Sequence, residues 1–288
     1  MTDGHALMES LRPAKLVDRE AALLKAVDEY DLPPLNFAPL TSTNHAHTAT
    51  IMVMADSLMI GTENSVRIPA SATLCQQIAD RLGLMMPTSR VFDLLWRQGS
   101  QLEPALQPAD PNERYKQKLD GPPYYSPSMG DIGASLKYHD DTDKEIAALT
   151  QPNGPLFAHG KVWLLTNAYA QHPGKAINYG YASKRAPYTS TSGIRMWQTP
   201  GSAHDCAHSD HSQIVRLFDP RIVVDGQQMD ARDVLVNPEL APLLSDEGVL
   251  KYLRVPGVPE LARGTVISIP EVTITGSPPE SRSQHDRH

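Results

Sequence analysis

The segment 204–212, HDCAHSDHS, concentrates side chains that can take part in chemistry. It holds three histidines, two aspartates, two serines and one of the chain's two cysteines within nine positions. Three interpretations fit such a run: a metal site, a nucleophile that is activated by a base, and a solvated turn that is rich in histidine. The sequence leaves all three open.

The metal interpretation depends on the spacing of His204 and His208. The two residues are four apart, as in the H-E-x-x-H zinc motif, and Asp205 stands where that motif has glutamate. On a helix both imidazoles would face one side and could share a tetrahedral zinc ion, with Cys206 and Asp210 as further ligands. The flanking residues lack the apolar periodicity of a buried helix, which weakens this alternative. Under the other two interpretations we expect no cofactor.

The nucleophile interpretation depends on Ser212, whose hydroxyl needs a base to take its proton. In an extended chain Asp210 and Ser212 would share one face, while the candidate His211 would point to the other. The base must then come from elsewhere in the chain. Two histidines beside regular elements are candidates for that base, His139 in KYHDD and His159 in FAHGK.

Cys206 is a second possible nucleophile within the same segment. A thiol becomes nucleophilic when a neighbouring cation lowers its pKa, and His204 or His208 could do so. The other cysteine, Cys75, lies at a helical position and is expected in the core. Two cysteines cannot make a disulfide framework, so we expect free thiols and a reducing compartment.

Four further side chains are candidate substrate contacts. Arg216 lies four residues after Ser212, on the same face of an extended strand, and could bind an anionic group through two hydrogen bonds. Lys161 in HGKVW could hold an anionic group or could be plain surface. Tyr124 and Tyr125 in GPPYYSP could line a cleft wall, or could anchor a proline-rich loop to the body.

Composition narrows the class of protein. The chain has 288 residues, of which 40% are hydrophobic and 20% charged, with a formal net charge of −7. That charge and the lack of basic runs argue against nucleic acid as a partner. No segment approaches the ~20 apolar residues that cross a bilayer, and the N-terminal residues do not resemble a secretory signal, so a cytoplasmic protein is expected. No glycine-rich phosphate loop is present, which argues against nucleotide cofactors.

Apolar periodicity and capping residues predict several helices. Residues 16–29 have apolar side chains on one face. Ser71 is expected to begin a helix that continues to Leu82 before Gly83, and Thr88 or Ser89 to begin another that ends near Trp96. A short helix is predicted over 143–149, and helical turns over 230–236 and 238–244.

Strands are predicted where β-branched and aromatic residues cluster, at 48–71, 161–167, 176–182 and 214–224. Because helices group together instead of alternating with strands, we expect an α+β fold. It would be a single domain over 1–276, with an antiparallel or mixed sheet and helices grouped towards the N-terminal half. A proline-rich excursion at 99–127 and a disordered tail at 277–288 complete the prediction.

The segment 210–248 resembles the C-terminal signature of a family of largely uncharacterised bacterial proteins. In that signature an Asp-Tyr-Ser-His-Gly segment precedes an arginine, a pair of short strands and a Leu-Ser-Asp-Glu-Gly segment. The blocks MADSLMIGTENSVRIP, IADRLGLMMPTSRVFDLLW and LFAHGKVWLLTN extend the resemblance to about residues 10–250. It implies a site without assigning an activity, and it points to His139, His159, Lys161, Asp210, Ser212 and Arg216.

This chain departs from that signature at three positions. His211, Gln213 and Ile214 stand where the family has tyrosine, histidine and glycine. If the family's histidine is a catalytic base, this chain must use another.

The leading functional hypothesis is a hydrolase or transferase that acts on an acyl or amide bond, in a peptide or a cell-wall-like polymer. Ser212 would be the nucleophile, His139 or His159 the base, and Asp210 an orienting carboxylate. A metal-dependent hydrolase and a non-catalytic protein that binds a small ligand or a polymer are the alternatives. Oligomeric state is left open by the sequence.

Overall fold

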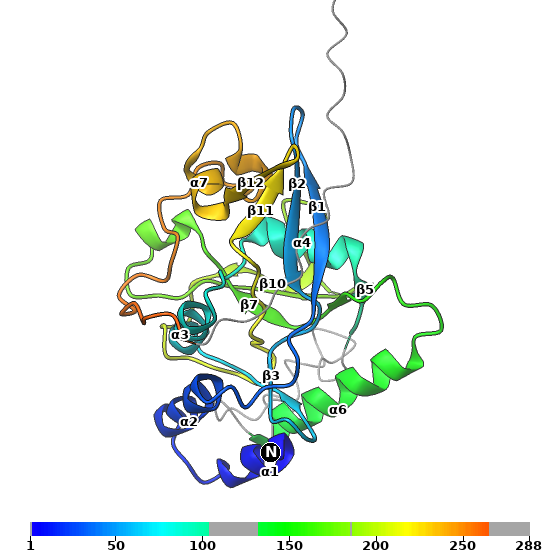
Figure 1. Cartoon of the computed structure of the whole chain (residues 1–288), viewed down its shortest axis with the longest axis vertical. Coiled ribbons are helices and arrows are strands. Elements are labelled where there is room, and N and C mark those ends of the chain that lie inside the picture. The colour runs from blue at the N-terminus through cyan, green and yellow to red at the C-terminus, as the bar shows by residue number, and fades with distance from the viewer. Residues whose placement is uncertain (1, 104–131, 185, 265–288) are drawn as a thin grey trace, which may run out of the picture.

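The chain has an α+β fold with mainly antiparallel strand pairs, as the sequence predicts (Figure 1). The structure is a computed structural model, which describes residues 2–103, 132–184 and 186–264. Most of the predicted excursion at 99–127 and the whole predicted tail at 277–288 lie outside these residues. The helices in the described part are α1 (Gly4–Ser10), α2 (Leu16–Asp28), α3 (Ala72–Leu82), α4 (Ser89–Gln98), α6 (Ile132–Ala148) and α7 (Ala231–Val236), with 3-10 turns at Asn167–Ala170 and Ala241–Leu243.

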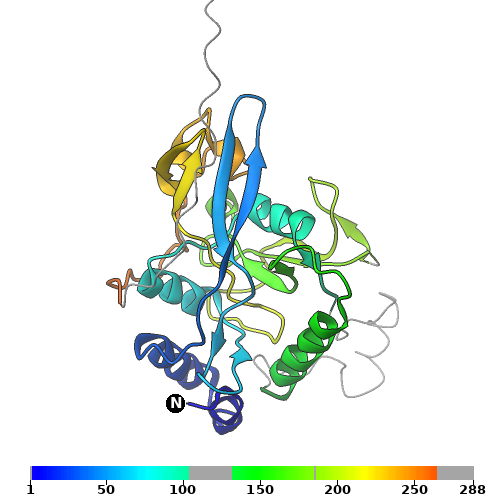
Figure 2. The ribbon, with the colours of Figure 1, turned by 45° about the vertical axis from the view of Figure 1, so that its right-hand side comes forward.

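Two four-stranded sheets contain most of the strands. Their orders are β1-β2-β11-β12 and β7-β8-β10-β9, while β3 pairs with β4, and β5 pairs with β6 in parallel. In Figure 2 the β1–β2 hairpin extends away from the lower helices, and α6 lies across the molecule from the β11–β12 hairpin. The strands are β1 (Phe37–Thr43), β2 (Thr48–Met54), β3 (Met59–Ile60), β4 (Val66–Arg67), β5 (Ser100–Gln101), β6 (Phe157–Ala158), β7 (Lys161–Trp163), β8 (Asn178–Ala182), β9 (Tyr188–Thr189), β10 (Arg195–Gly201), β11 (Arg221–Val224) and β12 (Gln227–Asp230).

Capping residues begin and end α3 and α4 where the sequence predicts. The hydroxyl of Ser71 accepts a hydrogen bond from the backbone N–H of Leu74, and Gly83 ends α3 with a φ of +66°. The hydroxyl of Thr88 does the same for the N–H of Val91 in α4. These contacts satisfy backbone groups that a helix terminus leaves without partners.

Two elements differ from the prediction, a strand that contains a proline and a helix that is longer than expected. The strand β1 lies in a proline-rich stretch, and its Pro39 is tolerated since β1 is at the edge of its sheet. The outer edge is partly covered by Gln98, whose side-chain amide pairs with the backbone of Thr41. The predicted short helix at 143–149 is in fact the end of α6, which begins at Ile132.

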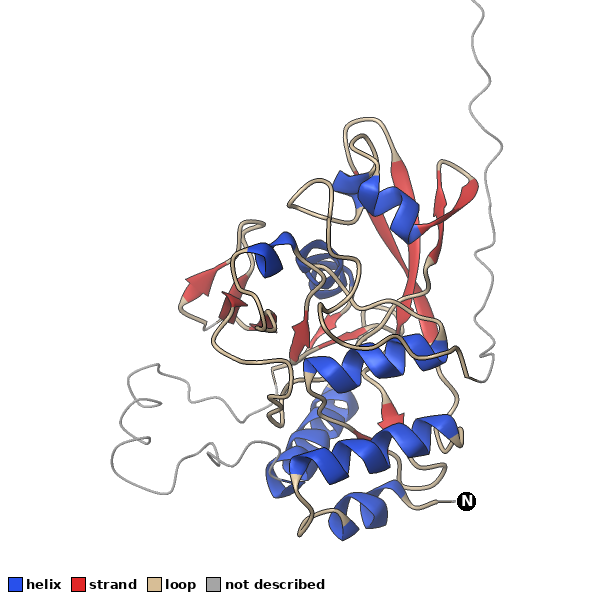
Figure 3. Cartoon of the chain, turned by 90° about the vertical axis from the view of Figure 1, so that its left-hand side faces the viewer, coloured by secondary structure: helices blue, strands red, loops and turns tan. Residues whose placement is uncertain are grey.

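The segment 212–219 runs through the middle of the molecule and connects the two large sheets. Residues 211–220 are all buried, although only Arg221–Val224 of the predicted strand at 214–224 forms regular sheet. Bridges pair Gln213 with Lys161 in β7, and Phe218 with Val53 in β2. Ile214, Val215, Leu217 and Phe218 of this segment belong to the apolar core. In Figure 3 helices gather mostly in the lower half of the molecule and strands in the upper half.

Candidate functional site

A buried group of polar side chains meets at Asp56, two residues after the end of β2. Its Oδ1 accepts hydrogen bonds from Nε2 of His159 at 2.8 Å and from the backbone N–H of Ser57 at 2.6 Å. Its Oδ2 accepts a hydrogen bond from Nη2 of Arg67 at 2.6 Å, and Nη2 of Arg216 lies 3.8 Å from Oδ1. We call Asp56, Arg67, Tyr138, His159 and Arg216 the Asp56 network.

Electrostatics keep the Asp56 carboxylate ionised. Burial alone would raise its pKa, but the hydrogen bond from His159 and the charge of Arg67 hold that pKa well below its ordinary value. Its side chain is 17% exposed, whereas those of His159 and Arg67 are 0% and 2% exposed. Asp56 is therefore the most exposed of these three side chains and can contact solvent or a ligand.

His159 connects Asp56 to Tyr138 on α6. Because a carboxylate can only accept, Nε2 of His159 carries the proton, and Nδ1 accepts a hydrogen bond from the Tyr138 hydroxyl at 2.8 Å. Burial lowers the pKa of His159 to about 4, although the Asp56 carboxylate opposes this shift. The imidazole is thus neutral at pH 7, and the Tyr138–His159–Asp56 chain orients the carboxylate.

Arg67 in β4 links the network to α6. Its Nη1 donates to Oδ1 of Asp143 at 2.5 Å and lies 3.0 Å from Nδ1 of His139. Burial lowers the pKa of His139, so this imidazole is neutral and can accept from the guanidinium. The predicted catalytic base His139 is therefore engaged by Arg67 and Asp143, whose carboxylate lies 3.4 Å from its Nε2.

A cleft of about 470 Å³ opens beside this network. Asp56, Arg67 and Asp143 form its polar end, and apolar side chains form most of the rest. Its walls come from the segment before β1, the end of β2, α6 and the turn before β6. The main apolar contributors are Pro33, Pro34, Leu35, Met54, Met59, Ile146, Pro155 and Phe157.

The segment 204–212 forms a separate and mostly local arrangement. The Ser212 hydroxyl donates to Oδ1 of Asp210 at 2.8 Å, and the ammonium of Lys161 donates to the other oxygen. Burial opposes ionisation of Asp210, but Lys161 and the Ser212 hydroxyl hold its pKa well below its ordinary value. Ser212 itself is 0% exposed, and it is not among the residues that line the cleft.

The structure does not pair Ser212 with either predicted base. The ring nitrogens of His159 contact Tyr138 and Asp56, and His139 contacts Arg67 and Asp143. The neighbouring His211 is buried, with its ring centroid 6.1 Å from that of Tyr138. Ser212 as a nucleophile stays a prediction, and among the described residues the geometry gives it a carboxylate partner instead of an imidazole.

The two histidines that the metal alternative names as ligands stack against each other. His204 and His208 lie with centroids 3.5 Å apart and planes 12° from parallel. No group of three or more histidine, cysteine, aspartate or glutamate side chains that could hold a metal ion occurs in the described part of the chain. Burial raises the pKa of the Cys206 thiol, which is the opposite of the change that a nucleophilic cysteine needs.

The predicted substrate anchors have other partners. Arg216 is buried and donates to the backbone carbonyls of Met54 at 2.9 Å and Phe157 at 2.6 Å. Lys161 is held by Asp210. Tyr124 and Tyr125 lie outside the described residues.

Sequence reasoning missed Asp56, Arg67 and Tyr138. One signal was available for the first, since an aspartate directly after the apolar run TIMVMA stands at the end of a buried strand, where polar side chains often reach a site. Tyr138 directly precedes His139, and the sequence predicted a role for the histidine but none for the tyrosine. Nothing in the local sequence around Arg67 marks it as a partner of Asp56.

Comparison with known proteins adds no relative. No protein-family model, no curated protein and no solved structure matches this chain. Within the described residues, no helix is long and apolar enough to cross a membrane.

Proposed function

We propose that this protein binds a small molecule with an apolar body and a positively charged ammonium group in the cleft beside Asp56. The observation that carries the proposal is the position of an ionised, rigidly held carboxylate at one end of an apolar cleft. The non-catalytic alternative of the sequence analysis is thus the one that the geometry favours.

The size and lining of the cleft support a ligand of this kind. Small-molecule sites are typically concave, mainly apolar and about 300–1,000 Å³ in volume, with a few polar groups that fix orientation. The cleft has a volume of about 470 Å³. Leu35, Met59 and Phe157 offer apolar surface against which an alkyl chain can pack.

The carboxylates at the polar end of the cleft support the proposal that the ligand carries an ammonium group. Asp56 and Asp143 line the cleft with two carboxylates, and Arg67 is the one guanidinium among the lining residues. Arg216, the second counter-charge of Asp56, lies behind that carboxylate and donates to backbone carbonyls. Arg67 already donates to both carboxylates, whereas the Asp143 side chain is 54% exposed. A ligand group that donates hydrogen bonds and carries positive charge therefore finds acceptors here.

Titration calorimetry with hexylamine tests the proposal, with hexanol and hexanoate as matched probes of the same chain length. We expect hexylamine to bind more tightly than hexanol, and hexanoate to bind weakest because the carboxylates repel it. Asp143→Asn should weaken hexylamine binding about fivefold, since it removes a partly exposed charge partner. Ile146→Trp should block the cleft.

Two variants on α7 serve as controls, because α7 and α6 lie at opposite ends of the molecule (Figure 1). Asp233→Asn matches the charge change and Val236→Trp the added ring, and both positions are exposed. Hexylamine affinity should not change in either control. Equal affinity for the three probes, or equal affinity in wild type and Ile146→Trp, would overturn the proposal.

A further inference from the structure

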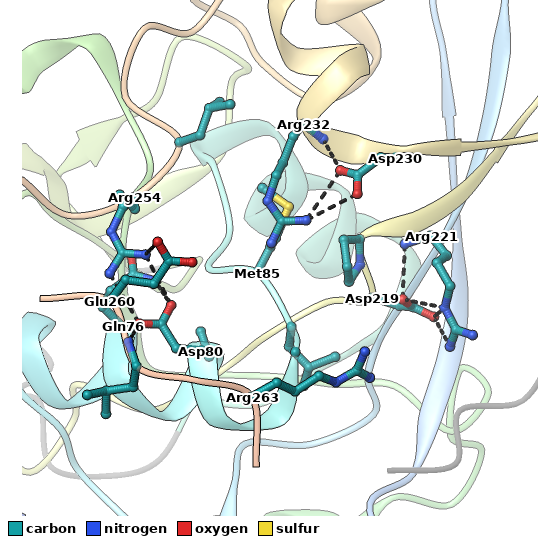
Figure 4. A pocket seen from close by; sticks show the side chains of 16 residues that line it. Gln76, Asp80, Met85, Asp219, Arg221, Asp230, Arg232, Arg254, Glu260 and Arg263 are labelled. Carbon is teal, nitrogen blue, oxygen red and sulfur yellow. Dashed lines mark hydrogen bonds and ion pairs between the residues drawn. The ribbon is translucent and has the colours of Figure 1, made fainter. Parts of the chain in front are cut away.

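A second pocket, of about 560 Å³, lies at a different place in the fold and shares no lining residue with the cleft. It is bounded by the C-terminal end of α3, the turn before β11, the first residues of α7 and the segment 253–263 (Figure 4). Its charged lining residues are four acids and four arginines, Asp80, Asp219, Asp230, Glu260, Arg221, Arg232, Arg254 and Arg263.

Every carboxylate of this pocket already has an arginine partner. Arg221 lies 2.9 Å from Asp219, and Arg232 lies 3.2 Å from Asp230. Arg254 lies 3.1 Å from Asp80 and 3.9 Å from Glu260. The eight charges sum to zero, but Arg254 serves two acids, so three arginines engage all four carboxylates and the guanidinium of the fourth keeps its hydrogen-bond donors for another acceptor.

That fourth arginine is Arg263. It has no hydrogen bond or ion pair with any described residue, yet its guanidinium packs closely over Gly83: a Cβ at that glycine would lie 2.5 Å from its Nε. Arg232 donates to Asp230 through Nη1, which leaves Nε and Nη2 for another acceptor. Figure 4 shows Arg232 and Arg263 entering the pocket from opposite sides.

Apart from Gln76, the uncharged side chains of the lining are apolar. Ala79, Leu84, Met85 and Leu253 lie between the charged groups, and the first three are buried. An arginine guanidinium matches the geometry of a carboxylate or phosphate, to which it can donate two parallel hydrogen bonds. We propose that this pocket binds the oxyanion, phosphate or carboxylate, of a small molecule whose apolar part packs between Leu84 and Met85.

Titration calorimetry with phenyl phosphate and phenylacetate tests this second site and distinguishes the two oxyanions. Benzyl alcohol is the neutral probe of similar apolar size. We expect one of the anions to bind saturably. Its affinity should fall as the salt concentration is raised, because dissolved ions screen a charge pair at the surface. The double variant Arg232→Gln, Arg263→Gln should weaken that binding about tenfold or more, since two charge-assisted hydrogen-bond donors are lost.

Arg12→Gln is the matched control, because Arg12 is an exposed arginine that pairs with Glu9 at α1, away from this pocket. Gly83→Ala tests the position of Arg263 without changing any charge, because the added methyl group pushes the guanidinium aside. This variant should also weaken anion binding. Hexylamine binding in the cleft should not change in any of these variants, so the two proposals fail separately. If neither anion binds at millimolar concentration, or if the double variant binds like wild type, the second site does not exist.

Discussion

Two polar regions of this molecule are built in opposite ways. In the segment 204–212 the polar side chains are neighbours in the sequence, and many of their contacts are local: Asp210 accepts from Ser212, and Asp205 accepts from the N–H of Ala207. In the Asp56 network the partners come from distant places, with Arg67 and His159 separated from Asp56 by 11 and 103 residues. The first region is held mainly by contacts among its own residues, with Lys161 of β7 as a partner from elsewhere, while the second presents a fixed charge to a cleft.

The difference has a physical cause. Short polar side chains that are close in sequence readily hydrogen-bond one another and the nearby backbone, which forms turns. A buried carboxylate must instead be compensated by donors that other elements supply, because an uncompensated buried charge is costly. Polar density along a sequence therefore marks a turn more readily than it marks a site.

The largest expected effect is the loss of the Asp56 carboxylate. Asp56→Ala leaves the buried Arg67 and Arg216 without their shared counter-charge, and should lower the free energy of unfolding by about 3–5 kcal/mol. Asp210→Ala removes the counter-charge of one lysine, Lys161, and the acceptor of the Ser212 hydroxyl. It should cost less, about 1–3 kcal/mol. Urea denaturation of both variants measures the comparison. An equal or larger cost at Asp210 would show that the two regions are not built differently.

An intermediate effect is the pH dependence that His159 gives to stability. Its pKa is about 4 in the folded protein and about 6.5 when unfolded. The unfolded chain thus takes up the proton first, and stability is lost as the pH falls from about 6.5 to about 4. At pH 5 the loss from this one group is about 2 kcal/mol. His159→Gln removes the titrating group, so its stability should fall less steeply over this range than that of wild type. Parallel curves from urea denaturation between pH 7 and pH 5 would contradict this assignment.

The smallest expected effect is at Ser212. Replacing it by alanine removes one buried hydrogen bond to Asp210 and should cost about 1 kcal/mol. A serine-directed covalent probe should label neither wild type nor Ser212→Ala, because the hydroxyl is buried and no histidine contacts it in the described structure. Labelling of wild type that disappears in Ser212→Ala would restore the hydrolase hypothesis.

The parts of the fold that could be predicted are those set by local chemistry. Ser71, Gly83 and Thr88 act within a few residues of their own position, so α3 and α4 begin and end as expected. The strand β1 was missed because a proline usually argues against a strand, and only the sheet order shows that Pro39 lies on an edge.

The candidate site was less predictable for the same reason. His139 and His159 were predicted as candidate bases, but their partners Arg67, Tyr138 and Asp56 are defined by the packing of β4 and α6 against the end of β2. No spacing rule connects residues that meet only after folding. Arg216 was expected to contact a substrate because it lies four residues after Ser212 on the same face of an extended strand, whereas the structure buries it against the backbone carbonyls of Met54 and Phe157.

The most direct test of the account is a map of backbone amide chemical shifts during a hexylamine titration. If the cleft beside Asp56 is the ligand site, the amides of Asn36, Ser57 and Phe157 should shift along saturating curves, while those of 204–212 stay in place. Shifts that gather on 204–212 and leave the cleft unchanged would contradict it, and would return the site to the histidine-rich segment.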